Sequence, residues 1–305
     1  MRSLCERLGI SASTFAESGF PARLRQIPDP PLLLFHRGEL TCYRAPAVAI
    51  VGARRASRLG CETAATLATT LAANGIAVIS GLALGIDSAA HRGALLAEAG
   101  ALTIAALGSG LGFVAPVTNM PLAESIVAAG GLLVSEYPPM MQARPHHFPE
   151  RNRIISGLAD VVVVVEANER SGSLITARLA LEQGRDVLAV PGPVSAANSR
   201  GVNALLKQGA GLVDSAQDVL DALTARGVKA NPPAPSESPN QAALSPAAAL
   251  LLETIPGATI SFDALSRSSG RNAAALNALL SELELAGFVA RTGGGYIRRP
   301  FSNLR

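Results

Sequence analysis

The chain has 305 residues, of which 49% are hydrophobic and 16% are charged. This length and composition exclude an intrinsically disordered protein and allow one sizeable domain together with a smaller one. The net charge is only +3 and the pI is about 9.0, so the charge balance permits an anionic partner without requiring one. The positive excess lies mainly in residues 1–58, where nine arginines stand against four acidic residues.

Cysteine spacing and hydropathy narrow the class further. Cys5, Cys42 and Cys61 show neither a metal-binding spacing nor a disulfide framework. No apolar run approaches ~18 residues and the N-terminus lacks an apolar targeting segment, so we expect a cytoplasmic protein without a membrane partner. All basic residues except Lys207 and Lys229 are arginines. A planar guanidinium suits phosphate oxygens, but genomic base composition explains such a bias equally well.

The chain before residue 46 has little periodicity, and residues 27–38 are extended at best. From residue 46 onward, short apolar runs alternate with Ala- and Leu-rich stretches of helical length. Apolar runs without polar alternation are typical of strands buried on both faces, with the helices as crossovers of a parallel sheet. We therefore predict a doubly wound α/β fold with a mostly parallel sheet. The predicted strands lie within residues 47–52, 76–81, 101–107, 131–137, 160–167 and 185–192.

A second, smaller domain is expected at the C-terminal end. Residues 230–241, "ANPPAPSESPNQ", have the composition of a linker. The chain beyond them predicts three helices and a glycine-turned hairpin, which is the winged-helix pattern. Ser245 and Pro246 supply a helix start, and Gly287 supplies a helix end. The predicted boundaries are an N-terminal segment 1–45, the α/β domain 46–225, a linker 226–242 and the winged helix 243–300.

The loops that follow the predicted strands should meet at one edge of the sheet, because ligands of such folds bind at the carboxyl ends of the strands. These loops are rich in Gly, Ser and Arg and poor in catalytic side chains. They comprise residues 52–60, 80–87, 108–112, 135–139 and 166–177.

Three apparent motifs carry little weight. "GSGLG" (108–112) lacks the position and the following acid of a dinucleotide-binding turn, so no cofactor is predicted. Asp87 and His91 share a helix face, and with no nucleophile beside them we interpret Asp87 as a first-turn cap that orients the imidazole. His146 and His147 have no partner ligands, so no metal site is predicted.

The loop after the five-valine strand is the best candidate for a binding site. Ser171, Gly172 and Ser173 stand at the start of the next predicted helix, where free N–H groups make an anion site. Ordinary helix capping explains the two serines as well. Five arginines would surround this site if the loops converge, and Phe148 lies among them; an aromatic ring among arginines is one way to bind single-stranded nucleic acid. The arginines are Arg54, Arg55, Arg144, Arg151 and Arg153.

A series of segments in order resembles the DNA-processing protein A family. They read "VAIVGARRAS", "SGLALGIDSAAHRGAL", "GLLVSEYPP", "HFPERNRIISGLADVVVVVEANERSGSLITARLALEQGRDVLAVPG" and "SRGVNALLKQGA", within residues 20–222. The resemblance implies an extended Rossmann domain that binds single-stranded DNA without sequence preference, forms homodimers and helps to load the RecA recombinase during natural transformation. The C-terminal part is similar to the winged-helix domain found in many members.

The resemblance also assigns residues by position. The family's Gly-Ser-Arg turn corresponds to Gly52-Ala53-Arg54, which makes Arg54 a main phosphate contact and replaces the serine by Ala53. The Phe-Pro-x-Arg-Asn-Arg motif is intact from Phe148 to Arg153. Residues 108–119 depart from the family, with Gly112 and Ala115-Pro116 in place of an Asp and a Tyr-Pro pair, so no DNA contact is assigned to that loop. The predicted DNA-binding residues are Arg54, Arg55, Ser80, Gly81, Arg144, Phe148, Arg151, Asn152, Arg153, Ser171, Gly172 and Ser173.

Two other functions remain as alternatives. The fold and the "SGSLITA" loop also resemble nucleotide phosphoribohydrolases, but Thr176 stands where those enzymes carry their glutamate. Without a general acid, hydrolysis lacks its main group, and we expect a protein that is not an enzyme. A transcription factor acting through the winged helix is disfavoured, because residues 243–305 hold six arginines against four acidic residues, a small excess for a DNA-reading domain.

A homodimer is expected through the last helix and strand of the α/β domain, residues 199–213. This element follows the last central strand and should form the edge of the sheet, which has to be paired or shielded. Packing within one chain is the ordinary explanation for its apolar residues, and the family resemblance favours a dimer. The predicted interface residues are Asn203, Leu206 and Leu212.

Overall fold

The computed structural model describes residues 2–38, 40–97, 103–230, 244–255, 260–285, 288–292 and 295–298. The chain divides into two compact units, Met1–Ala234 and Pro235–Arg305. The first unit is a doubly wound α/β domain and the second is a winged helix, as the sequence predicted. Among the helices of the described ranges, none has the combination of length and apolarity that crossing a bilayer demands.

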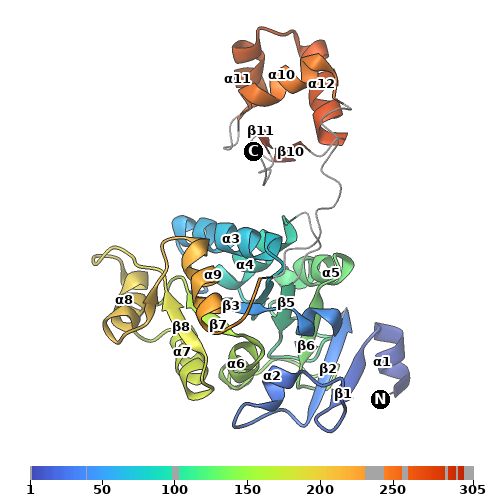
Figure 1. The fold of residues 1–305 in the computed structure, drawn as a ribbon. Helices are drawn as coiled ribbons and strands as arrows, with labels where there is room; N and C mark the ends of the chain where they lie inside the picture. Colours follow the sequence, from blue (N-terminus) through green and yellow to red (C-terminus); the bar gives the residue numbers. More distant parts are fainter. Residues whose placement is uncertain are drawn as a thin grey trace. The chain divides into compact units, whose positions relative to one another are not determined.

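A nine-stranded sheet forms the centre of the first unit (Figure 1). Its order is β1-β2-β6-β5-β4-β3-β7-β8-β9. The strands from β3 to β9 pair in parallel, whereas β2 pairs antiparallel with both β1 and β6. The strands are β1 (Ser11–Thr14), β2 (Leu33–Gly38), β3 (Ala47–Val51), β4 (Ala77–Ser80), β5 (Thr103–Ala106), β6 (Leu132–Ser135), β7 (Val161–Val164), β8 (Asp186–Ala189) and β9 (Gly211–Leu212).

The N-terminal segment, for which we expected extended chain only within residues 27–38, adds two strands to this sheet. It also contains the short helices α1 (Arg2–Leu8) and α2 (Ala22–Arg25). Leu34 and Phe35 of β2 are both buried, and they pack into different clusters on opposite sides of the sheet. The boundary predicted at residue 45 therefore falls inside one continuous sheet.

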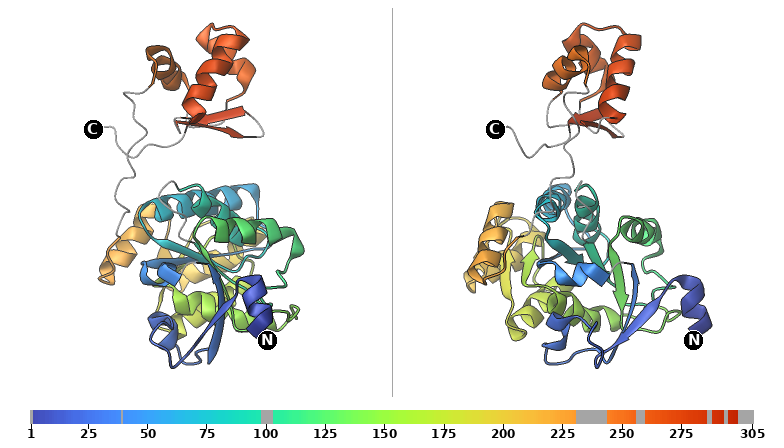
Figure 2. Two further views of the ribbon diagram at one scale, coloured as in Figure 1. Left: turned by 90° about the vertical axis from the view of Figure 1, so that its right-hand side faces the viewer. Right: turned by 45° about the vertical axis from the view of Figure 1, so that its right-hand side comes forward.

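The valine run shows why the central strands need apolar residues at every position. Val161, Val163 and Val165 pack into one core cluster, whereas Val162 and Val164 pack into the other. Successive side chains of a strand point to opposite faces, and helices cover both faces here (Figure 2). One face carries α3 (Arg58–Ala73), α4 (Ile86–Leu95), α5 (Met120–Ala128) and α9 (Ala216–Ala225), and the other carries α2, α6 (His147–Leu158), α7 (Gly172–Glu182) and α8 (Arg200–Lys207).

The order of the strands places a crevice beside β3. From β3 the chain moves outward through β4, β5 and β6, and then α6 returns it to β7 on the other side of β3. The loops on the two sides diverge at this point, and ligands of open α/β sheets bind there. Both α6 and α7 begin at this edge of the sheet, since α6 follows the end of β6 and α7 follows the end of β7.

The second unit consists of α10 (Pro246–Thr254), α11 (Phe262–Ser269), α12 (Ala273–Leu285) and a hairpin of β10 (Val289–Thr292) and β11 (Gly295–Arg298). Ser245 caps α10 as predicted, since its hydroxyl accepts the N–H of Ala248 at 3.2 Å. Leu251, Leu276 and Phe288 belong to its core. Gly287 and residues 231–241 of the predicted linker lie outside the described residues.

Candidate functional site

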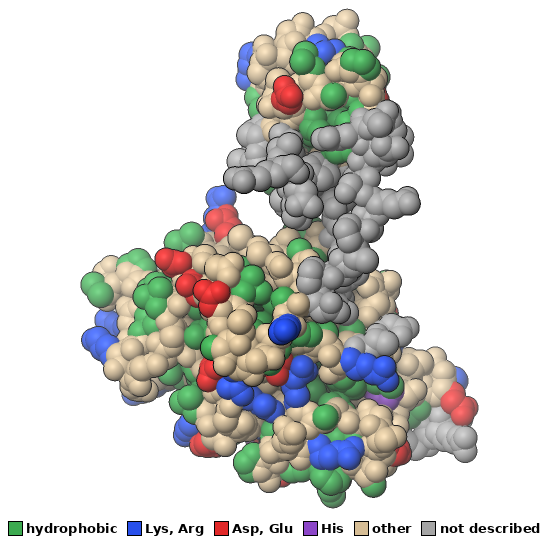
Figure 3. Space-filling model, viewed as in Figure 1, with side chains coloured by type: hydrophobic (Ala, Val, Ile, Leu, Met, Phe, Trp, Pro, Cys, Tyr) green, Lys and Arg blue, Asp and Glu red, His purple; other side chains and the backbone are tan. Residues whose placement is uncertain are grey.

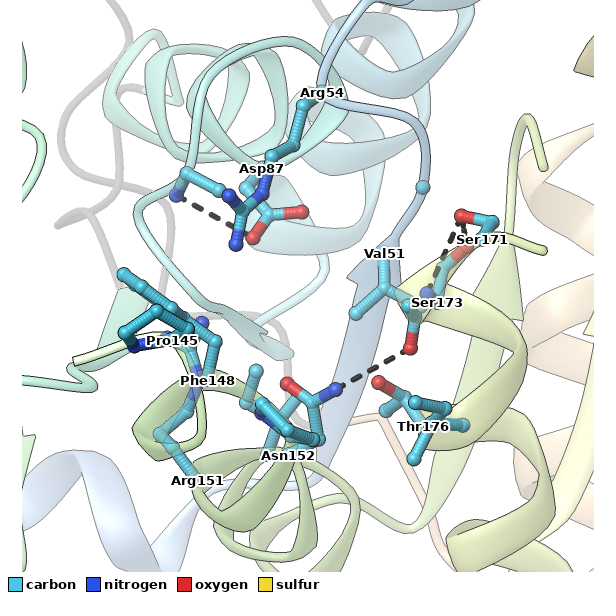
Figure 4. A pocket seen from close by; sticks show the side chains of 16 residues that line it. Val51, Arg54, Asp87, Pro145, Phe148, Arg151, Asn152, Ser171, Ser173 and Thr176 are labelled. Carbon is cyan, nitrogen blue, oxygen red and sulfur yellow. Dashed lines mark hydrogen bonds between the residues drawn. The ribbon is translucent and has the colours of Figure 1, made fainter. Parts of the chain in front are cut away.

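A pocket of about 420 Å³ lies at the crevice between β3 and β7. Four segments line it: the end of β3 with its loop, the loop before α4 together with the first turn of α4, the first turns of α6, and the first turn of α7 (Figure 4). Seven of the predicted DNA-binding residues come together there. They are Arg54, Phe148, Arg151, Asn152, Ser171, Gly172 and Ser173.

The N-terminus of α7 forms one wall. Ser171 is its N-cap and accepts the N–H of Ser173 at 3.4 Å, and the two hydroxyl oxygens lie 2.7 Å apart. Asn152 of α6 donates its side-chain N–H to the carbonyl of Gly172 at 3.3 Å, which joins the two helices. The positive ends of the two helix dipoles favour an anion here, although the N–H groups of His147 and Glu150 in α6 and of Ser173 and Leu174 in α7 already have acceptors within the chain.

An arginine and an aromatic ring stand together at the mouth of the pocket. The guanidinium carbon of Arg54 lies 4.7 Å from the ring centroid of Phe148, a cation–π contact. Arg54 is exposed and Phe148 is half-buried. The ring lies against the backbone of Gly108, where a Cβ atom would be 3.1 Å from Cδ1 of Phe148. A planar cation and an aromatic ring therefore lie close enough together for one ligand in the pocket to contact both.

Arg151 lines the same pocket but lies inside the protein, 3% exposed. Its Nη1 donates to the carbonyl of Gly81 at 2.7 Å and to the carbonyl of Ala106. Burial, and to a smaller extent the charge of Arg54, lower the pKa of Arg151 to about 10, although the carboxylate of Asp87 opposes this shift. The guanidinium therefore stays charged at neutral pH, and it joins the loop after β4 to the end of β5 instead of standing open to solvent.

Asp87 is a pocket residue whose partners differ from those expected. Its Oδ2 accepts the N–H groups of Gly81 at 3.1 Å and Ala83 at 3.4 Å. Burial raises the pKa of Asp87, and the charge of Arg151 opposes this rise. The expected contact with His91 is wrong: the imidazole Nδ1 pairs with the Thr103 hydroxyl at 2.8 Å, because Asp87 turns back toward the loop that precedes its helix.

That loop, residues 81–85, lies tightly against the turn that carries Arg54. Gly85 has a φ of +77°, and a Cβ atom there would lie 2.3 Å from the carbonyl oxygen of Ala53. Leu82 also has a positive φ, 55°, a conformation that non-glycine residues rarely adopt. Its carbonyl accepts the side-chain N–H of Asn119 at 2.8 Å. The close approach of the two loops requires a glycine at position 85.

The other predicted residues do not line the pocket. Ser80 is buried and donates to the carbonyl of Ile50 at 2.6 Å, and Gly81 packs directly against the Arg151 guanidinium. Arg153 is paired with Asp29 at 2.9 Å and with Glu136 at 2.8 Å, so its charge is already compensated. Arg55 and Arg144 are exposed outside the pocket. On the face of the first unit that Figure 3 shows, Lys and Arg side chains gather across the middle.

Several lining residues were not selected from the sequence. They include Asp87, Val51, Pro145 and Thr176. Asp87 follows a glycine-rich loop at the carboxyl edge of the sheet, a position that could have marked it as part of the site. The divergent loop 108–119 does not line the pocket, and the N–H of Gly112 donates to the carbonyl of Pro139 at 2.8 Å.

The residues expected at a dimer interface occupy different environments. The side chain of Asn203 bonds to the carbonyl and the N–H of Gly192, at 2.9 Å and 3.3 Å. Leu206 packs against the core of its own unit, whereas Leu212 of β9 is 53% exposed. β9 is an edge strand of the sheet, as predicted.

Fold and site together define a doubly wound α/β protein with an arginine-containing pocket at its switch point and a winged helix as a second unit. Residues 11–224 match the family model of DNA recombination-mediator protein A, and residues 232–295 match that of the DprA winged helix domain. The chain belongs to this family, which confirms the resemblance seen in its motifs.

Relatives and solved structures agree with this assignment. The chain is 41% identical over 282 residues to Protein Smf of Escherichia coli, covering 92% of this chain and 75% of the relative. It is 45% identical over 201 residues to DNA processing protein DprA of Streptococcus pneumoniae, covering 66% and 70%. The X-ray structure of DNA processing protein A from S. pneumoniae aligns with a TM-score of 0.66 at 40% identity, covering 72% of this chain and 77% of that one. A Helicobacter pylori structure, described in terms of its single-stranded DNA binding mode, aligns with a TM-score of 0.64 at 32% identity, covering 71% and 96%.

The buried imidazole of His91 predicts an acid-sensitive fold. Burial, together with the charges of Arg151 and Arg92, lowers its pKa from 6.5 to about 3. Between these values the unfolded chain binds a proton that the folded protein does not, so the free energy of unfolding falls as the pH is lowered, by up to about 1.4 kcal/mol per pH unit. In urea titrations at pH 7 and pH 5, His91→Asn should reduce the stability difference between the two pH values by about 2 kcal/mol. An unchanged difference would show that His91 does not cause it.

Proposed function

We propose that the pocket and its rim bind single-stranded DNA without sequence preference. The observation that carries this proposal is the Arg54 guanidinium over the Phe148 ring, 4.7 Å from its centroid, at a pocket where two helices begin. The helix N-termini and Arg54 supply phosphate contacts, and the aromatic face supplies a surface on which any base can stack. The single-stranded DNA binding mode named for the H. pylori relative supports the same assignment.

Lack of sequence preference follows from what the polar side chains of the pocket already bind. Arg151 donates to two backbone carbonyls, and Asn152 donates to the carbonyl of Gly172. Asp87 accepts two backbone N–H groups. Arg151, Asn152 and Asp87 are thus engaged within the protein, whereas stacking and phosphate contacts do not distinguish bases. A duplex keeps its bases stacked, so Phe148 favours single strands.

We propose further that the protein mediates recombination in the cytoplasm. In this role it binds incoming single strands during natural transformation and helps to load the RecA recombinase on them. The family description, DNA recombination-mediator protein A, supports this role. We further propose that the protein acts as a homodimer through α8 and β9, because β9 is an edge strand and carries an exposed leucine, Leu212.

Nucleotide hydrolysis is the competing function for this pocket, and Asp87 is the acidic side chain that lines it in the described part of the chain. A general acid has to reach the substrate. Asp87 is 7% exposed and accepts two loop N–H groups, and Thr176 occupies the position that the hydrolases fill with glutamate. We therefore propose a binding protein, and turnover of AMP by the purified protein would contradict this proposal.

Arg54→Ala should weaken binding to single-stranded oligonucleotides of every sequence by about tenfold or more, the effect of removing a charged hydrogen bond. The log–log slope of affinity against salt should become shallower by about 0.7 for each phosphate that the variant no longer neutralises. Fluorescence anisotropy at several salt concentrations measures both. Arg178→Ala is the matched control, because Arg178 is an exposed arginine outside the pocket, with 70% of its side chain accessible. Equal affinity of the wild-type protein for duplex DNA would overturn the proposal.

Phe148→Ala should weaken single-strand binding by about 1–3 kcal/mol through the loss of stacking. Its salt slope should stay that of the wild type, because stacking releases no counterions. Anisotropy titrations beside thermal unfolding curves check this. A lower Tm with unchanged affinity of the folded protein would make Phe148 a packing residue.

Leu212→Glu should convert a dimer into a folded monomer, because a carboxylate buried at an interface without a partner costs several kcal/mol. Leu212 is a better probe than Leu206, which packs against the core of its own chain. Leu32→Glu is the control, since Leu32 is 78% exposed and adjoins β2 near the opposite end of the sheet. Light scattering at micromolar concentration gives the mass. A wild-type monomer, or a dimer of the Leu212 variant, would place the interface elsewhere or remove it.

A further inference from the structure

The turn that carries Arg54, residues 52–57, is here called the Arg54 loop. It is anchored on each side of Arg54 through a backbone carbonyl. The N–H of Ile86 donates to the carbonyl of Ala53 at 3.3 Å, and the side chain of Asn198 donates to the carbonyl of Arg55 at 2.9 Å. The first anchor comes from α4 and the second from the chain just before α8. The backbone position of Arg54 therefore depends on Asn198 directly.

Glu166, at the end of β7, anchors the last residue of the Arg54 loop. Its carboxylate accepts the N–H of Ser57 at 2.9 Å and also the hydroxyl of Ser57. The side chain of Asn198 donates to the same carboxylate at 3.2 Å. Gly60 makes room for it, because a Cβ atom at that position would lie 2.5 Å from the carboxyl carbon. Glu166 and Asn198 thus form one hydrogen-bonded unit behind the loop.

Asn198 is itself held in place. It belongs to the 3-10 turn Ala197–Ser199, which leads into α8. Its carbonyl accepts the N–H of Ala167 at 2.7 Å, and the N–H of Gly201 donates to the carbonyl of Ala167 at 2.8 Å. These bonds join the start of α8 to the loop between β7 and α7. The amide of Asn198 therefore reaches the Arg54 loop from a fixed base.

We propose that Asn198 and Glu166 are positioning residues for the DNA site, which hold the backbone of the Arg54 loop so that the Arg54 guanidinium rests over Phe148. This inference rests on the proposed binding of single-stranded DNA at the pocket. Neither residue lines the pocket, so both act through Arg54. A loop ordered before the ligand arrives loses less conformational entropy on binding.

The negative charge of Glu166 allows positioning to be separated from electrostatics. A carboxylate near an anion site opposes phosphate by Coulomb repulsion, so a purely electrostatic role predicts tighter DNA binding by Glu166→Gln and by Glu166→Ala. A glutamine side chain keeps an oxygen for Ser57 and Asn198 and an N–H for the Ser57 hydroxyl. Positioning therefore predicts near wild-type affinity for Glu166→Gln and weaker binding for Glu166→Ala.

A double-mutant cycle with Arg54 is the decisive experiment. The full-length protein is titrated against a labelled oligothymidylate at several salt concentrations, as wild type, Asn198→Ala, Arg54→Ala and the double variant. Asn198→Ala should bind about fivefold more weakly, the equivalent of one hydrogen bond. Its salt slope should become shallower although Asn198 carries no charge, because the loosened group is an arginine. In the Arg54→Ala background the same change should have no further effect, since the two residues act as one unit.

The control is Asn74→Ala, which removes a side-chain hydrogen bond of 2.8 Å at the opposite end of α3 and should leave the affinity unchanged. A full fivefold loss in the Arg54→Ala background, or none in the wild-type background, would overturn the inference. If Arg54→Ala itself binds as the wild type does, the proposed function fails; if only Asn198→Ala is without effect, the positioning role alone fails. Should Asn198→Ala not fold, Glu166→Ala takes its place in the same cycle with the same outcomes.

Discussion

The buried guanidinium of Arg151 is the interaction on which the site depends. It donates to the carbonyls of Gly81 and Ala106, just past the end of β4 and at the end of β5. Buried carbonyls at strand ends need hydrogen-bond donors. A buried cation in turn needs an opposite charge and hydrogen-bond acceptors around it. Asp87 supplies the opposite charge and fixes the loop after β4 through two N–H groups. Because Phe148 lies one turn earlier on α6, the same contact holds the stacking surface against the sheet edge.

The central sheet and its crossovers were predictable, because strands buried on both faces leave uninterrupted apolar runs and the helices between them are long. The first two strands were not. β1 has the sequence "SAST" with one buried residue, and β2 pairs with β6, about a hundred residues away. Such strands are stabilised by distant partners, and local pattern does not reveal them. The winged helix was predictable from Ser245, from its helix-length stretches and from its glycine-turned hairpin.

In the candidate site, the sequence located the segments better than the roles of their side chains. Arg54, Phe148 and Ser171 do meet at one pocket, since the loops after β3, β4 and β7 converge there with the start of α6. Arg151 and Arg153 look alike in sequence, yet one is buried against carbonyls and the other is paired with Asp29 and Glu136. Their partners come from β4, β5, β6 and the N-terminal segment, and an arginine's role is set by those partners. The spacing of Asp87 and His91 predicted a shared helix face but not which neighbours each side chain binds.

The short path of hydrogen bonds from α8 to the Arg54 loop has a consequence for regulation. Linkage makes any coupling between two sites reciprocal. The Asn198 amide joins the chain just before α8, where the subunit contact is proposed, to the backbone next to Arg54. In the proposed dimer, a strand bound at that arginine would in turn bias the orientation of α8. Under the proposed function, binding of the nucleic acid and pairing of the subunits would then be thermodynamically coupled, so that each changes the affinity of the other.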